Sequence, residues 1–145
     1  MYNERFVVST RGFADILDLT EKVQRVVAAS NASSGLVNVF VPGSTAGVTT
    51  VEYESGALED LKRAFERVAP QNDDYEHNNR WGDGNGFSHV RAAMLGPSLT
   101  VPFEQRKLLH GTWQQIVLVD FDNRPRKRDV VVSVLGTASK GGPTS

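Results

Sequence analysis

The end of the chain consists of strand-like segments separated by short turns, and this arrangement constrains the fold more than any other feature. Apolar and β-branched residues dominate four segments, at residues 99–103, 107–111, 113–121 and 129–135. Strands therefore outnumber helices and are concentrated at one end of the chain. This distribution predicts an α+β fold with a mixed, mostly antiparallel sheet packed with two or three helices.

The first half of the chain supplies further strands and the predicted helices. We expect strands at residues 5–10, 13–19, 36–41 and 48–54, with a turn at 31–35. For residues 13–19 a strand is preferred over a short helix. Helical spacing of apolar residues predicts helices at 21–30, capped by Thr20, at 56–68, and at 88–94, capped by Ser88. Residues 70–87 have no periodicity and predict a long loop.

Length and composition limit the class of protein. A chain of 145 residues fits one domain, since a single core is usual below about 200 residues. We assign residues 1–136 to this domain and the small, polar residues 137–145 to a flexible tail.

Charge and cysteine content exclude several functions. A formal net charge of −1 offers no field for nucleic acid or a membrane surface, and the lack of cysteine excludes disulfides and thiolate chemistry. The N-terminus has no signal-peptide pattern, and no apolar run approaches the roughly 20 residues that span a bilayer. We therefore expect a cytoplasmic protein.

The segment PGSTAG, residues 42–47, joins two predicted strands with small residues only. Small side chains let backbone amides approach a ligand, and the hydroxyls of Ser44 and Thr45 add donors for a phosphate oxygen. The alternative is a plain tight turn. The segment is not a Walker loop, because no Gly-Lys-Ser/Thr follows.

Three histidines are present, and two of them flank the glycine-rich segment GDGNG at residues 82–86. His77 and His89, with Glu52 or Asp83, would suit a divalent cation. They would equally suit binding of phosphate or transfer of a proton, and ordinary surface histidines are the remaining alternative. His110 is expected to be a strand residue.

Arginines and a tryptophan surround the last strands. Arg91 follows His89 by two residues, and Arg124 follows the longest apolar strand. Guanidinium groups suit phosphate oxygens. Lys127 and Arg128 are expected to be part of a solvated turn, and Trp113 with Gln114 would supply an aromatic wall and an amide.

Together these segments resemble the YjbQ-like family, known as the secondary thiamine-phosphate synthase family. The resemblance covers residues 6–136 and is carried by GSTAGVTTVEYE, APQNDDYEHN, WGDGNGFSHVRAAMLGPSLTVPF and GTWQQIVLVDFDNRPRKR. It implies a small α+β protein that assembles as a homotrimer, with sites near subunit boundaries. The residues that fall on the family's polar motif positions are Glu52, His77, His89, Thr112, Gln114, Ser44, Thr45 and Thr49.

The resemblance also implies an activity, thiamine-phosphate synthesis, in which a pyrimidine-methyl diphosphate is joined to a thiazole phosphate and pyrophosphate is released. Under this hypothesis His89 and Arg91 bind the diphosphate, with His77 and Glu52 in the same catalytic group. A divalent metal, Mg²⁺ or Zn²⁺, would be held by His77, His89 and Glu52. The remaining substrate contacts would come from Ser44, Thr45, Thr49, Thr112, Trp113, Gln114 and Arg124.

The chain departs from the family pattern at several positions. Relatives often carry histidine where Gly43 and Phe87 stand, so His77 and His89 are the only family-type imidazoles here. The turn at 105–106 and His110 also differ. The alternative to an enzyme is a non-catalytic trimeric protein that binds a phosphorylated metabolite or a divalent metal.

Overall fold

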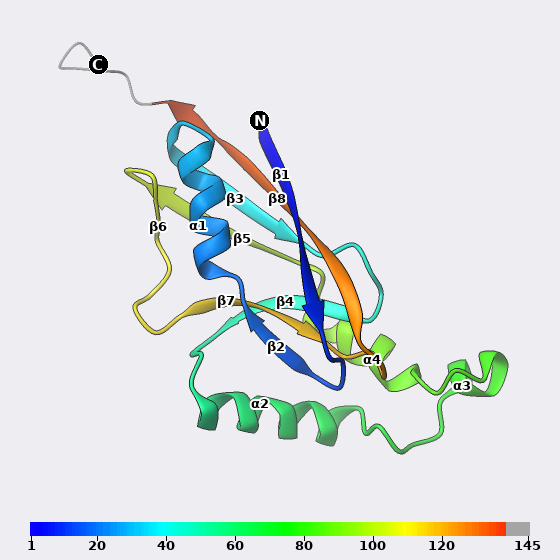
Figure 1. Ribbon diagram of the computed structural model, residues 1–145. Helices are drawn as coiled ribbons and strands as arrows, with labels where there is room; N and C mark the ends of the chain where they lie inside the picture. The colour runs from blue at the N-terminus through cyan, green and yellow to red at the C-terminus, as the bar shows by residue number, and fades with distance from the viewer. Residues whose placement is uncertain (139–145) are drawn as a thin grey trace, which may run out of the picture.

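The computed structural model describes residues 1–138 and shows eight strands and four helices in one α+β unit (Figure 1). The strands form two antiparallel sheets. The larger has the order β1-β8-β3-β5-β6 and the smaller the order β2-β7-β4. The predicted fold class is confirmed, with two antiparallel sheets in place of one mixed sheet.

The larger sheet is built around the long strand β8, Arg126–Ala138. Strand β8 pairs with β1, Tyr2–Thr10, on one side and with β3, Ala32–Phe40, on the other. The sheet continues through β5, Ser98–Glu104, to the short edge strand β6, Lys107–Leu108. Helix α1, Thr20–Ala29, lies along this sheet in Figure 1 and packs Val23, Val26 and Val27 into its core.

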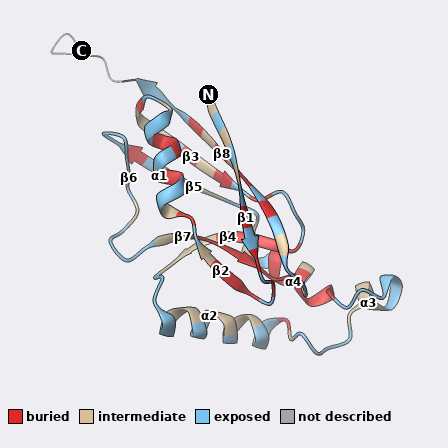
Figure 2. Ribbon diagram, viewed as in Figure 1, coloured by how far each residue is buried: buried red, intermediate tan, exposed pale blue. Residues whose placement is uncertain are grey.

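The smaller sheet has a central strand that is buried on both faces. Strand β7, Gln115–Asp120, lies between β2, Asp15–Asp18, and β4, Ala46–Val51. Its residues Ile116 and Leu118 face the core of the larger sheet, while Val117 and Val119 face a second core. A continuous apolar run is expected for a strand covered on both faces, and Figure 2 shows β7 buried.

Two helices cover the outer face of the smaller sheet. Helix α2, Ser55–Val68, and helix α4, Gly86–Leu95, supply the residues that close the second core, with α3, Glu76–Trp81, between them in the chain (Figure 1). The side chain of Glu54 accepts hydrogen bonds from two amides of the first turn of α2. No residue of α2 is fully buried, so its partly buried Leu58, Leu61 and Phe65 hold it to the sheet.

Several element boundaries differ from the sequence prediction. The predicted turn at 31–35 is part of β3, because Ala32 and Ser34 pair with β8 across a register shift. The predicted loop at 70–87 contains α3 and the start of α4. The predicted strand at 107–111 ends at Leu108.

The two predicted caps are also wrong. Thr20 Oγ1 accepts a hydrogen bond from the amide of Ile116 rather than from its own helix. Ser88 lies inside α4 and donates to the carbonyl of Asn85, which is the N-cap residue.

Strand β8 extends two residues past the position where the sequence places the tail. Residues 137 and 138, assigned to the tail from the sequence, continue β8, and the remainder of the tail lies outside the described residues. Among the described helices, none combines the length and apolarity needed to cross a membrane.

The attachment of α2 generates a stability prediction. Phe121 is fully buried, and its ring meets that of Phe65 edge-on at 4.6 Å between centroids. Replacing Phe121 by alanine should lower the free energy of unfolding by about 3–5 kcal/mol, the usual cost of a large cavity. The exposed control Glu59→Ala should change it by less than about 0.5 kcal/mol in the same urea titrations. Equal losses in the two variants would contradict this packing.

Candidate functional site

A buried charge network lies beneath the turn at residues 42–47. Asp120 at the end of β7 and Asp122 just beyond it are fully buried. Arg128 on β8 binds Asp120 through two parallel hydrogen bonds of 2.8 and 2.9 Å, and Arg126 donates to Asp122 at 2.9 Å. Thr10 of β1 also donates to Asp120. Each buried carboxylate therefore has an arginine partner, as buried charges require.

Asp122 connects this network to two surface segments. It accepts hydrogen bonds from Thr45 in the turn and from Asn85 at the N-cap of α4. Burial alone would raise the pKa of Asp122, but the hydrogen bonds from Arg126, the Asn123 amide, Asn85 and Thr45 outweigh it and lower that pKa to about 2. Asp122 is therefore a fixed negative charge that holds the turn and the start of α4 together.

The two histidines predicted to act together are in contact. His77 on α3 and His89 on α4 have ring centroids 4.2 Å apart, with their planes tilted by 37°. His77 Nδ1 lies 3.3 Å from Asp83 Oδ1 and is buried without a well-aligned hydrogen bond. The loop between the helices brings these three side chains together.

Glycines in this loop permit the close approach of α3 and α4. Gly82 and Gly84 adopt left-handed conformations with φ of 72° and 70°. A Cβ on Gly86 would lie 2.6 Å from Tyr75 Cβ, while the Gly86 amide donates to Asn78 at 2.8 Å.

His89 is the titratable side chain that lines a small pocket. The pocket has a volume of about 260 Å³ and is lined by Gly43, Ser44, Ala46, His89, Ala92, Ala93 and Pro97. Burial lowers the pKa of His89, the neighbouring imidazole of His77 lowers it further, and Asp83 and Asp122 offset part of this effect. His89 therefore favours the neutral imidazole more strongly than a free histidine does.

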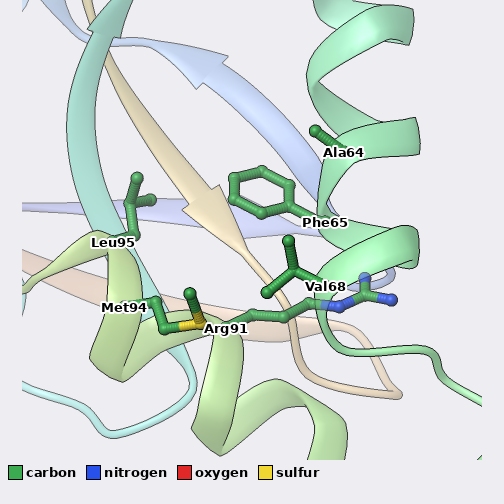
Figure 3. A pocket seen from close by; sticks show the side chains of 6 residues that line it. All are labelled: Ala64, Phe65, Val68, Arg91, Met94 and Leu95. Carbon is green, nitrogen blue, oxygen red and sulfur yellow. The ribbon is translucent and has the colours of Figure 1, made fainter.

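Arg91 points away from this pocket. Its guanidinium donates to Glu66 at 2.8 Å and to the Ala69 carbonyl at 2.9 Å, and it lies 4.9 Å from the centroid of the Phe87 ring. Figure 3 shows the Arg91 side chain beneath α2, in an apolar pocket of about 230 Å³. Arg91 thus ties α4 to α2, and the structure does not bring it to His89.

Glu52 also lies apart from the histidines. It follows the last residue of β4, whereas Ala46 beside His89 is the first, and a six-residue strand spans roughly 20 Å. Within residues 1–138, no three His, Asp or Glu side chains are grouped so that they could hold a metal ion. The predicted ligand set His77, His89 and Glu52 is therefore not assembled within one chain.

The remaining predicted residues lie around Glu52. Thr112 and Trp113 line a second, open pocket of about 510 Å³ with Glu52 and Tyr53. Gln114 Oε1 accepts from the Gly111 amide and its Nε2 donates to Thr50, which closes the turn before β7. Two further predicted residues lie elsewhere: partly buried Thr49 on β4, and exposed Arg124 in the turn before β8.

The buried network was not predicted from the sequence, and the prediction for Arg128 is wrong. Lys127 is exposed as expected, but Arg128 is only 8% exposed. A signal was present, because Asp120 and Asp122 are spaced by two residues, as are Arg126 and Arg128. Side chains two residues apart on a strand share a face, so this matched spacing of acids and bases indicates that Asp120 and Asp122 could face Arg126 and Arg128 as two ion pairs.

Comparisons with known proteins identify the family. The family model described as UPF0047 protein YjbQ-like matches residues 4–137. A UPF0047 protein of Archaeoglobus fulgidus is 39% identical over 121 residues, which cover 83% of this chain and 91% of the relative. The UPF0047 protein Rv2556c of Mycobacterium tuberculosis is 42% identical over 118 residues, which cover 81% and 86%.

Solved structures agree with the fold. A YbjQ-like protein of unknown function from Sulfolobus solfataricus matches with a TM-score of 0.88 and 32% identity, covering 93% of this chain and 96% of the other. The hypothetical protein APE1520 from Aeropyrum pernix matches with a TM-score of 0.86 and 31% identity, covering 94% and 99%.

These comparisons correct the expected activity. The matching family and the relatives are described only as UPF0047 or YjbQ-like, and the Sulfolobus structure is described as being of unknown function. None of these descriptions mentions thiamine or its synthesis. The assignment as a thiamine-phosphate synthase, and with it the place in thiamine biosynthesis, is therefore wrong on these findings, whereas the resemblance to the family is confirmed.

The buried network generates a prediction on pH and stability. Because the pKa of Asp122 is about 2 in the folded protein and ordinarily about 3.8, its stabilising contribution is present above the ordinary value and is lost as the pH falls through 2. Asp122→Asn should lower the free energy of unfolding at pH 7 by about 2 kcal/mol, since a neutral amide replaces the buried charged acceptor of the hydrogen bonds from Arg126, Thr45 and Asn85. The loss should shrink between pH 4 and pH 2 in urea titrations.

Asp129→Asn is the matched control, because Asp129 is exposed on β8. It should leave stability nearly unchanged at pH 7. A pH-independent loss for Asp122→Asn would contradict the proposed charge of this carboxyl group.

Proposed function

We propose that this protein, which belongs to the UPF0047 family of YjbQ-like proteins, binds a small phosphorylated metabolite in the pocket beside His89. The observation that carries the proposal is the contact between the rings of His77 and His89 at the edge of this pocket. Burial and the neighbouring imidazole of His77 disfavour positive charge on His89, and an anion bound beside His89 would offset that penalty.

The lining of the pocket supports a ligand of this kind. The exposed Ser44 offers a hydroxyl donor, and the small residues of the turn leave backbone amides accessible. A volume of about 260 Å³ lies just under the usual range of about 300–1,000 Å³ for small-molecule sites. The site therefore suits a phosphate group that carries a few further atoms. Phosphorylated metabolites are compounds of the cell interior, so the proposal includes a cytoplasmic location.

A divalent transition-metal ion is the second candidate ligand. The lowered pKa of His89 favours the neutral imidazole, the form that binds metals. Among residues 1–138 no third His, Asp or Glu completes a metal-binding group with His77 and His89, so the two imidazoles would leave positions open for external ligands. This candidate predicts that binding is favoured as the pH rises, the opposite of the dependence expected for an anion.

The proposal includes assembly as a homotrimer. Trp113 is 73% exposed and lies beside the exposed Tyr53 at the second pocket. Large exposed aromatic side chains are typical of protein interfaces. In such a trimer the group around Glu52 would lie at a boundary between subunits.

The anion proposal is tested by calorimetry with inorganic phosphate, with sulfate as a probe whose charge is constant between pH 5 and pH 8. An anion bound beside the imidazole should raise the lowered pKa of His89, and binding should then be accompanied by proton uptake. Affinity for sulfate should rise as the pH falls from 8 to 5.5. His89→Gln should weaken phosphate binding at pH 6 about tenfold, the effect of losing one charge-assisted hydrogen bond.

His110→Gln is the control, because His110 is the third histidine and lies between β6 and β7, outside the lining of the pocket. It should bind phosphate as the unaltered protein does. Tight binding of Zn²⁺ that depends on His77 and His89, without binding of either anion, would favour the metal candidate.

The trimer is tested by light scattering coupled to size-exclusion chromatography. The unaltered protein should have about three times the mass of the 15.9 kDa chain. Trp113→Asp should shift it towards the monomer, since it would place a charge in an apolar contact. A monomer for the unaltered protein, or a trimer unaffected by Trp113→Asp, would contradict the assembly as described.

A further inference from the structure

The guanidinium of Arg128 is almost fully buried, yet one of its nitrogens is unused. Its Nε and Nη2 bind Asp120, and Nη2 also donates to Thr45. Among residues 1–138 no hydrogen bond involves Nη1. Arg128 is only 8% exposed, and Nη1 is not among the fully buried side-chain atoms that lack a partner, so Nη1 keeps part of this remaining exposure.

Gly43 leaves this nitrogen uncovered on the side of the turn. A Cβ on Gly43 would lie only 2.8 Å from Arg128 Nη1 and 3.9 Å from Cζ. Gly43 itself is exposed and lines the pocket together with Ser44 and His89. The space left by the missing side chain therefore connects the buried guanidinium with the pocket.

From this placement we propose that Arg128 Nη1 is a recognition group for the ligand, reached through the gap at Gly43. The ligand class is a phosphate monoester, whose tetrahedral oxygens can meet donors from different directions. This inference rests on the proposed function, and it adds a specificity-determining residue that the imidazoles alone do not supply. Arg128 is held rigidly by Asp120, so the donor is already oriented before the ligand arrives.

The charge balance of the network fits this role. Asp120 and Asp122 offset the charges of Arg126 and Arg128, so the network beneath the turn is close to neutral. An oxyanion at Nη1 therefore gains a directed, charge-assisted hydrogen bond, while the variable positive charge of the site comes from protonation of His89. Recognition by Arg128 should accordingly be independent of pH, whereas the contribution of His89 is not.

Gly43→Ala tests the inference without removing any group of the network. The backbone of Gly43 is not in the left-handed region, so alanine fits the backbone conformation. Its Cβ would lie 2.8 Å from Nη1, closer than an ordinary contact, so the guanidinium or the turn must shift as Nη1 is covered. We expect affinity for inorganic phosphate at pH 6 to fall at least fivefold, with the rise in sulfate affinity towards low pH retained. Gly111→Ala is the matched control, since its added Cβ would make only ordinary contacts, at 3.5 Å or more.

Arg128→Lys provides a second readout, because it keeps the charge but loses the planar fork. It should also weaken phosphate binding, while Lys127→Gln, which removes an exposed charge at the adjacent position, should not. The thermal unfolding midpoint of each variant shows whether it folds. If Arg128→Lys does not fold, the binding measurement on Gly43→Ala alone tests the role of Arg128.

The outcomes separate this inference from the proposed function. If the unaltered protein binds neither phosphate nor sulfate at concentrations up to about 10 mM, an affinity too weak to be specific, the proposed function and the role of Arg128 are both overturned. If it binds and His89→Gln weakens binding, but Gly43→Ala binds equally well, only the role of Arg128 is overturned. A fivefold or larger loss in Gly43→Ala, with Gly111→Ala unchanged, supports it.

Discussion

The candidate site depends on the buried carboxylate of Asp122. This group joins the turn at residues 42–47, the start of α4 and the turn between β7 and β8, which are distant in the sequence. Its ion pair with Arg126 offsets the cost of burying it. Without this carboxylate, the hydrogen bonds from Thr45 and Asn85 that tie the turn carrying Ser44 to the helix carrying His89 would be lost.

The network also determines the electrostatic character of the pocket. Because both buried carboxylates have arginine partners, the protein does not present a strong fixed field to the ligand. The variable charge comes from His89, whose pKa is lowered by its burial and then by the neighbouring His77, so that it favours the neutral imidazole. A site of this kind has low charge when empty and gains charge together with an anionic ligand.

The sequence predicted the elements that depend on local patterns and missed those that depend on distant partners. Helix α2 follows from the helical spacing of its apolar residues, and strands β1, β5 and β7 from short runs of apolar and β-branched residues. The contact between His77 and His89 was one of several open alternatives, because only the fold decides how the glycine loop brings α3 to α4. The prediction for Arg128 failed because its partner, Asp120, lies on another strand.

Distant partners also explain why the predicted grouping of Glu52 and Arg91 with the histidines is wrong. Both were grouped with the histidines from their type and from the resemblance, yet Glu52 lies at the far end of β4 and Arg91 faces α2. Residues two apart on a helix, such as His89 and Arg91, point to different sides. Side-chain direction on a predicted helix would have separated them.

The most direct test of the account is an NMR titration of the imidazole of His89, with and without saturating sulfate. The account predicts a pKa below 6.5 in the free protein, because of burial and the neighbouring His77, and a clear rise when the anion is bound. A value at or above 6.5 in the free protein, or no change on adding the anion, would contradict it.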